Sequence, residues 1–179
     1  MAGRQVTNGC PQRAASHEPV RPRRIAARAT AILIAALSLL VVARAANITI
    51  SGSWSRTIGS GDLQGGAGSN LNPTYASSSN QVYMSVTTTL TNWRVDILRI
   101  DSSWNSNFVL SIRRTGNGMG SGTVSGGTNY QTILTTSQTL VTGSGNLYLI
   151  ALQEQLGGVS VSIPVATYST TIQYTAVDQ

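Results

Sequence analysis

Four carboxylate side chains could supply acid–base chemistry in this sequence, namely Asp62, Asp96, Asp101 and Glu154. A glycosidase needs two such groups on opposite sides of a cleft, with separated pKa values. Asp96 and Asp101, however, each stand two residues after an arginine, Arg94 or Arg99. Because alternate residues of a strand share one face, we expect salt bridges on a solvated surface there. The pattern favours these salt bridges over a catalytic pair of carboxylates.

Other reactive side chains are confined to the N-terminal part of the chain or missing. The single Cys10 and the single His17 both precede residue 46, and there is no lysine. Residues 46–179 therefore have no thiolate, no imidazole base and no Cys or His metal ligand, which excludes Ser-His-Asp, Cys-His and zinc-hydrolase chemistry. The lack of lysine excludes Schiff-base chemistry. We predict a domain that is not an enzyme, with no catalytic, cofactor-binding or metal-binding residues.

Aromatic and amide side chains offer a binding site instead. Trp104 lies in a polar segment together with Asn105 and Asn107. An aromatic face suits a sugar ring and amides suit hydroxyl groups, so these three residues are a candidate carbohydrate site. Trp54 and Trp93 continue the apolar faces of their expected strands, and we expect both of them to be core residues.

The first 45 residues have the composition of a secretory signal peptide. A polar, arginine-rich segment (residues 1–28) precedes an apolar run from Ala29 to Val42, which is followed by Ala43-Arg44-Ala45. This pattern predicts cleavage after Ala45 and export, so the protein would touch a membrane only through its leader. An uncleaved anchor is the alternative, although the apolar run is shorter than the roughly 20 residues of a membrane span. The basic segment is long, and Val20 is an alternative start to Met1.

Removal of the leader changes the charge of the protein. Seven of the 12 arginines lie at or before Arg44, and residues 46–179 keep five arginines against five carboxylates. Their net charge is therefore zero, and a nucleic-acid partner loses its electrostatic basis. The same residues include 20 Ser and 19 Thr, so the surface is expected to be polar but mostly uncharged.

Strand patterns are densest at the C-terminal end. Residues 168–176 alternate in polarity, with Ile172 and Tyr174 on one face and threonines on the other. Residues 159–163 alternate in the same way, and Gly157-Gly158 before them could form a hairpin turn. Residues 147–152 are apolar on both faces, which predicts a central strand, with a short buried helix as the alternative.

Further strands are expected at fairly even spacing through residues 46–145. A β-bulge between Ile97 and Leu98 would reconcile a switch of the apolar face. Residues 55–80 read as a long glycine-rich loop. The expected strands are residues 47–54, 81–90, 93–100, 108–112, 130–134 and 139–141.

Short strands with glycine-rich turns and no helix predict one all-β domain over residues 46–179. The expected architecture is an antiparallel two-sheet sandwich of the Ig-like kind, with a jelly roll as the alternative. The first and last strands lie near the chain ends, where sheet edges are expected. Their apolar residues, Ile48, Ile50, Trp54, Ile172 and Tyr174, mark the strands through which subunits could associate.

The C-terminal segment also resembles a known group of proteins. Pro164 followed by TYSTTIQYTAV is similar to the last strand of spore-coat-U-type and pilin-like subunits, in which a Pro and a Tyr introduce alternating Thr and apolar residues. The resemblance implies an extracellular structural role.

The expected function is a secreted or cell-surface structural subunit, with other copies or other surface subunits as its partners. The alternative is an extracellular carbohydrate-binding module that uses Trp104 and has a glycan as its partner. A glycoside-active enzyme is the remaining alternative.

Overall fold

The computed structural model describes residues 46–87 and 92–179, which all belong to the unit Ala43–Gln179. The expectations for the leader, for the start site and for residues 88–91 lie outside the described residues. In the part of the chain that is described, no helix is long and apolar enough to span a membrane.

The first sheet is built around the central strand β10, Leu147–Gly157, with every pairing antiparallel. β10 pairs with β3, Val82–Thr87, on one side and with β5, Val109–Arg114, on the other. Residues 147–152 are thus central, as predicted. The other strands of this sheet are β1 (Asn47–Ser51), β2 (Thr74–Ala76), β6 (Met119–Gly120) and β8 (Gln131–Thr132).

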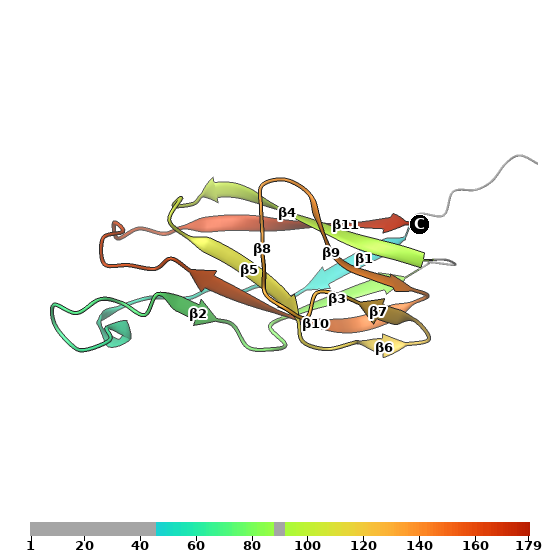
Figure 1. The fold of residues 1–179 in the computed structure, drawn as a ribbon, viewed down its shortest axis with the longest axis horizontal. Coiled ribbons are helices and arrows are strands. Elements are labelled where there is room, and N and C mark those ends of the chain that lie inside the picture. Colours follow the sequence, from blue (N-terminus) through green and yellow to red (C-terminus); the bar gives the residue numbers. More distant parts are fainter. Residues whose placement is uncertain (1–45, 88–91) are drawn as a thin grey trace, which may run out of the picture. The chain divides into compact units, whose positions relative to one another are not determined.

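The second sheet has the order β11-β4-β9-β7 and is antiparallel throughout. Figure 1 shows its two longest strands, β4 and β11, running side by side. The bounds are Asn92–Ser103 for β4, Thr123–Ser125 for β7, Gln138–Ser144 for β9 and Ser169–Asp178 for β11. The two sheets pack face to face, which confirms the predicted all-β antiparallel sandwich.

Six of the strands follow the order of an Ig-like sandwich. The order β1-β3-β10-β5 matches the A-B-E-D sheet of that fold, and β4 and β11 take the places of strands C and F. β9 lies on the other side of β4. Among the described residues, no strand pairs with the outer edge of β11, where strand G of an Ig domain would lie.

Alternating residues of both sheets form one apolar core. β3 contributes Val82, Met84 and Val86, each at most 2% exposed. Trp93 of β4 is fully buried, and its indole N–H donates to the Gly145 carbonyl at 2.8 Å. Ile172 and Tyr174 of β11 pack against this core from the edge of the second sheet. The alternation that the sequence shows in these strands is therefore the alternation of core and solvent.

The predicted strand at residues 159–163 is absent, and this part of the prediction is wrong. β10 continues to Gly157 instead, and Gly158, at φ +76°, turns the chain into a loop. Both sides of β10 are already occupied by other strands, so residues 159–163 have no edge of that strand to pair with. Val159 is buried, and its N–H donates to the Pro73 carbonyl at 3.2 Å.

The predicted bulge between Ile97 and Leu98 is also wrong. β4 keeps one register with β11 from the pair Asp101↔Thr170 to the pair Trp93↔Asp178. The apolar side chains after Ile97 therefore face outward, and Ile100 is 48% exposed. Arg99 takes the inward position that the pattern assigned to an apolar residue.

Short elements interrupt the segments expected to be loops. β2 and the 3-10 helix η1, Ser60–Asp62, lie within residues 55–80. β6 and β7 lie between β5 and β8. These elements are two or three residues long and carry too little alternation to be recognised from the sequence.

Candidate functional site

A cavity of about 900 Å³ opens at one end of the sandwich, between the two sheets. Its floor includes Val82, Leu110 and Leu156 of the first sheet. Its walls are the segment after β1, the loop after β10 and the first half of β11. Figure 1 shows the loop after β10 and the segment before β2 at the same end of the molecule. The lining therefore combines segments from both ends of the described chain.

Glu154 is the carboxylate of this cavity. It stands in the inward row of β10 between Leu152 and Leu156, and the residue is only 7% exposed. Its backbone is held by Ser77, which donates its N–H to the Glu154 carbonyl at 2.8 Å. Its carboxylate has no hydrogen-bond or ion-pair partner among the described residues. Burial raises the pKa of this carboxyl group because water no longer stabilises its charge.

Two more polar groups beside the cavity lack partners. The Tyr174 hydroxyl and the Trp104 indole N–H are buried and make no hydrogen bond within the described part of the chain. Burial, with a smaller contribution from the Glu154 carboxylate, raises the pKa of the Tyr174 hydroxyl far above its ordinary value. Buried polar groups in proteins are normally paired. An unsatisfied group at a cavity wall is available to a molecule that enters the cavity.

An aromatic cluster holds one wall of the cavity in place. Phe108 meets Trp104 edge to face, with ring centroids 5.4 Å apart, and meets Tyr168 in the same manner at 5.1 Å. The Tyr168 hydroxyl donates to the Pro164 carbonyl at 2.7 Å, which ties the loop after β10 to this cluster. The Arg99 guanidinium lies 4.9 Å from the Trp104 ring centroid. Such contacts fix the orientation of the rings.

The predicted carbohydrate site is only partly brought together. Trp104 lines the cavity but is half-buried, and Arg99 covers one of its faces. The Asn105 side chain accepts a hydrogen bond from the Asn107 N–H at 2.9 Å, so it closes the local turn. Neither asparagine lines the cavity. The site expected from sequence thus contributes one residue of three to the cavity wall.

Four of the five predicted assembly residues meet in the same cavity. Ile50 and Trp54, near the start of the domain, line it together with Ile172 and Tyr174 of β11. Ile48 packs against the core beside them. These side chains point inward, so the backbone edges of β1 and β11 are what remains exposed for association.

The remaining carboxylates are paired, as expected for salt bridges. Arg94 Nε lies 3.0 Å from Asp96, which also accepts a hydrogen bond from the Thr139 hydroxyl at 2.7 Å. Arg99 Nε lies 3.0 Å from Asp101, although the two groups are not aligned as a hydrogen bond.

Asp62 forms a third ion pair, with Arg56. A hydrogen bond from the Gly59 N–H, and the adjacent Arg56 guanidinium, lower the pKa of Asp62 against the opposing effect of its desolvation. This pair lies in the loop before β2, and Asp62 does not line the cavity.

Arg113 and Arg114 have structural contacts that the sequence did not reveal. Arg114 is 8% exposed and donates from Nε to the Gly126 carbonyl at 2.9 Å. Arg113 donates to the Gln153 side chain at 2.9 Å and lies 4.6 Å from the centroid of the Tyr130 ring. Arg114 therefore holds the glycine-rich segment that follows β5, whereas Arg113 contacts β10 and the Tyr130 ring.

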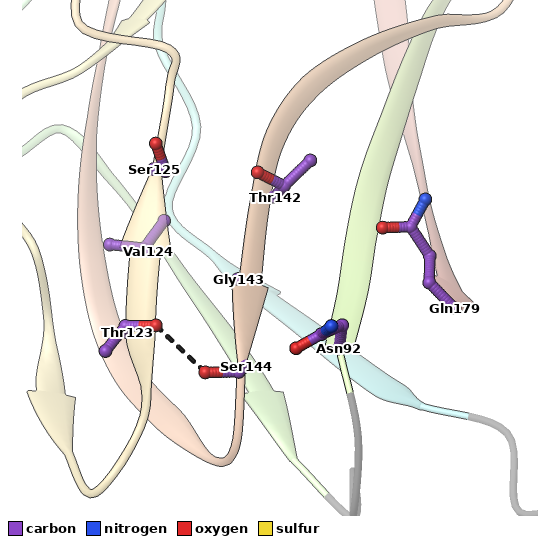
Figure 2. A pocket seen from close by; sticks show the side chains of 8 residues that line it. All are labelled: Asn92, Thr123, Val124, Ser125, Thr142, Gly143, Ser144 and Gln179. Carbon is purple, nitrogen blue, oxygen red and sulfur yellow. Dashed lines mark hydrogen bonds between the residues drawn. The ribbon is translucent and has the colours of Figure 1, made fainter.

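A smaller depression of about 350 Å³ lies on the second sheet, between β7, β9 and the start of β4 (Figure 2). Thr123 and Ser144 face each other there and share a hydrogen bond of 2.9 Å between their hydroxyl groups. Hydroxyl and amide groups dominate its lining, which contains no charged or aromatic residue. None of its lining side chains is suited to acid–base chemistry.

The position of Glu154 in an apolar row is a feature that could have been predicted from the sequence. Leu152, Glu154 and Leu156 share one face once the strand is extended to Gly157, so period-2 alternation already placed a carboxylate within an apolar row. The apolar run expected as a central strand ended at Leu152, so Glu154 was considered only as a possible acid–base group and was not placed in this row. Within the described residues, no group of three or more His, Cys, Asp and Glu side chains could hold a metal ion.

Comparison of the chain with protein-family models, with curated proteins and with solved structures gives no match.

Proposed function

We propose that this chain is an exported, non-catalytic structural subunit of a cell-surface, coat or fibre assembly, and that its copies associate through the edge of β11. The observation that carries the proposal is the ten-residue length of β11 combined with its unpaired outer edge among the described strands. An exposed strand edge presents backbone N–H and C=O groups that another strand can pair with.

The side chains of β11 do nothing to block such pairing. Proteins usually protect an exposed edge with lysine, proline or inward-pointing charges. β11 contains no lysine and no proline, and its solvent face consists of Ser169, Thr171, Gln173 and Thr175. Its one charged residue, Asp178, stands at the very end. The zero net charge of residues 46–179 also removes the repulsion that keeps domains apart.

The lining of the cavities supports a non-catalytic role. Glu154 is the one carboxylate that lines either cavity described above. A glycosidase would need a second carboxylate across the same cleft. The aromatic wall that includes Trp104 keeps a carbohydrate-binding module as the second candidate function.

The proposal is tested by sedimentation velocity on residues 46–179 over a range of concentrations. The wild-type chain should grow in size with concentration. A double variant, Thr171→Lys with Thr175→Lys, adds two positive charges to the β11 edge and should remain monomeric. The matched control adds the same charges to exposed loop positions, Thr128→Lys with Thr135→Lys, and should still associate.

A strictly monomeric wild-type chain would reject self-association. Quenching of its tryptophan fluorescence by a soluble glycan would then support the carbohydrate-binding module. Equal effects of the edge variant and the loop variant would show that added charge, rather than the β11 edge, controls assembly.

A further inference from the structure

The cavity between the sheets has one uncompensated charge in its lining. Two residues with acidic or basic side chains, Glu154 and Arg56, line this cavity. Arg56 is already paired with Asp62, and its guanidinium also lies 5.0 Å from the centroid of the Tyr75 ring. Glu154 has no partner and is 7% exposed. A buried carboxylate without a counter-charge is costly, and an incoming positive charge would offset that cost.

Aromatic side chains line the same cavity as this charge. Five aromatic side chains line the cavity: Trp54, Trp104, Phe108, Tyr168 and Tyr174. The faces of such rings attract cations, and the combination of rings with a carboxylate is well suited to ammonium groups. Aliphatic side chains such as Ile50, Leu156 and Ile172 provide the remaining apolar surface. The volume of about 900 Å³ falls within the range of small-molecule sites.

We propose that this cavity is a binding site for a small organic cation, in which an ammonium group on an apolar body pairs with the Glu154 carboxylate. An anion would be repelled by Glu154. A neutral ligand could fill the apolar surface but would leave the carboxylate unpaired. A cation satisfies both features of the cavity, and it does so without any metal ion or covalent step.

The site is separate from the edge pairing proposed above, because the ligand enters the space between the sheets while assembly uses the backbone edge of β11. Binding is therefore measured on dilute, monomeric protein, and its result does not depend on whether the chain assembles.

The experiment compares choline with its neutral isostere 3,3-dimethylbutan-1-ol, using the tryptophan fluorescence of residues 46–179 at about pH 8, which is well above the ordinary pKa of a carboxyl group. Choline should bind saturably and about tenfold more tightly than the isostere, because only the cation pairs with a buried carboxylate. Choline binding should weaken as the pH falls and Glu154 takes up a proton.

Two variants identify the group responsible. Glu154→Gln should reduce the affinity for choline about tenfold or more and leave binding of the isostere unchanged. Asp96→Asn removes the same charge from a carboxylate outside the cavity and should change choline binding less than about twofold. Circular dichroism and thermal melting confirm that both variants are folded.

Three results would overturn the proposal: no saturable binding of choline, equal binding of choline and its isostere, or equal effects of the two variants. A third probe, methyl glucoside, covers the neutral alternative. Saturable binding of methyl glucoside that survives Glu154→Gln, without binding of choline, would assign the cavity to a neutral sugar instead.

Discussion

Replacement of Glu154 should stabilise the folded domain at neutral and alkaline pH. The Glu154 carboxylate is buried in an apolar row of β10 and has no partner among the described residues. Folding therefore takes most of the Glu154 residue out of water without returning an ion pair or a hydrogen bond to its carboxylate. Glu154→Met fills the same space with an apolar side chain, and Glu154→Gln removes only the charge.

The size of the effect follows from the cost of an unsatisfied buried group, which is about 1–3 kcal/mol and larger for a charged one. We expect Glu154→Met to raise the free energy of unfolding by about 2–3 kcal/mol at pH 8, because it also buries apolar surface. Glu154→Gln should raise it by about 1 kcal/mol, since its amide group remains without a partner.

The gain should depend on pH in a defined direction. Burial raises the folded-state pKa of Glu154 above the ordinary value of 4.5, so the folded chain binds this proton more tightly than the unfolded chain does. Stability of the wild type should therefore fall as the pH rises from about 4.5 through the raised pKa. The advantage of both variants should be smallest below this range and reach a plateau above it.

Urea denaturation of the wild type and both variants, repeated across this pH range, measures the difference. Asp96→Asn is the control, because Asp96 is paired with Arg94 and its loss should cost at most about 1 kcal/mol. Destabilisation by both Glu154 variants at about pH 8 would refute the reasoning, since it would mean that the carboxylate makes stabilising contacts in the folded protein.

Two further changes should reduce stability for stated reasons. Gly143→Ala should lower the free energy of unfolding in urea by about 1–3 kcal/mol, because a Cβ there would collide with the Trp93 ring and the Thr123 carbonyl. Gly61→Ala is the control and should have little effect, because a Cβ there would have nothing within 4 Å. Equal losses in the two variants would contradict the packing argument. The Ala46 N atom donates to Asp178 Oδ2 at 2.8 Å, and in a chain that begins at Ala46 this nitrogen would carry a positive charge. Asp178→Asn should therefore lower the free energy of unfolding of that chain by about 1–2 kcal/mol. The loss should be smaller in a chain with one residue added before Ala46, and equal losses would show that this charge contributes nothing.

The strands could be predicted where one face is buried and the other is solvated. β3, β11 and the first half of β4 alternate in this way, and Trp93, which was expected in the core, is fully buried. The prediction from alternation failed at residues 159–163. Alternation indicates that a segment has one apolar and one polar face, but it does not show whether a neighbouring strand has a free edge to pair with. It failed again after Ile97, where a partly buried cation, Arg99, occupies an inward position and apolar Ile100 is exposed.

The cavity was harder to foresee than the fold. The five residues expected to take part in assembly come from the two ends of the described chain, and four of them line one cavity only because β1 and β11 belong to different sheets. No local pattern encodes that arrangement. Glu154 could have been found from the alternation of β10 alone, but its lack of a partner depends on the packing of β11 opposite it.

The most direct test of the proposed assembly is hydrogen–deuterium exchange of residues 169–178, measured on dilute and on concentrated samples of residues 46–179. If copies pair through the edge of β11, the backbone N–H groups of this strand that point away from β4 should gain protection as the concentration rises, while those of β9, inside the same sheet, should not change. Assembly that leaves the exchange of β11 unaltered, or that protects another surface instead, would contradict the account.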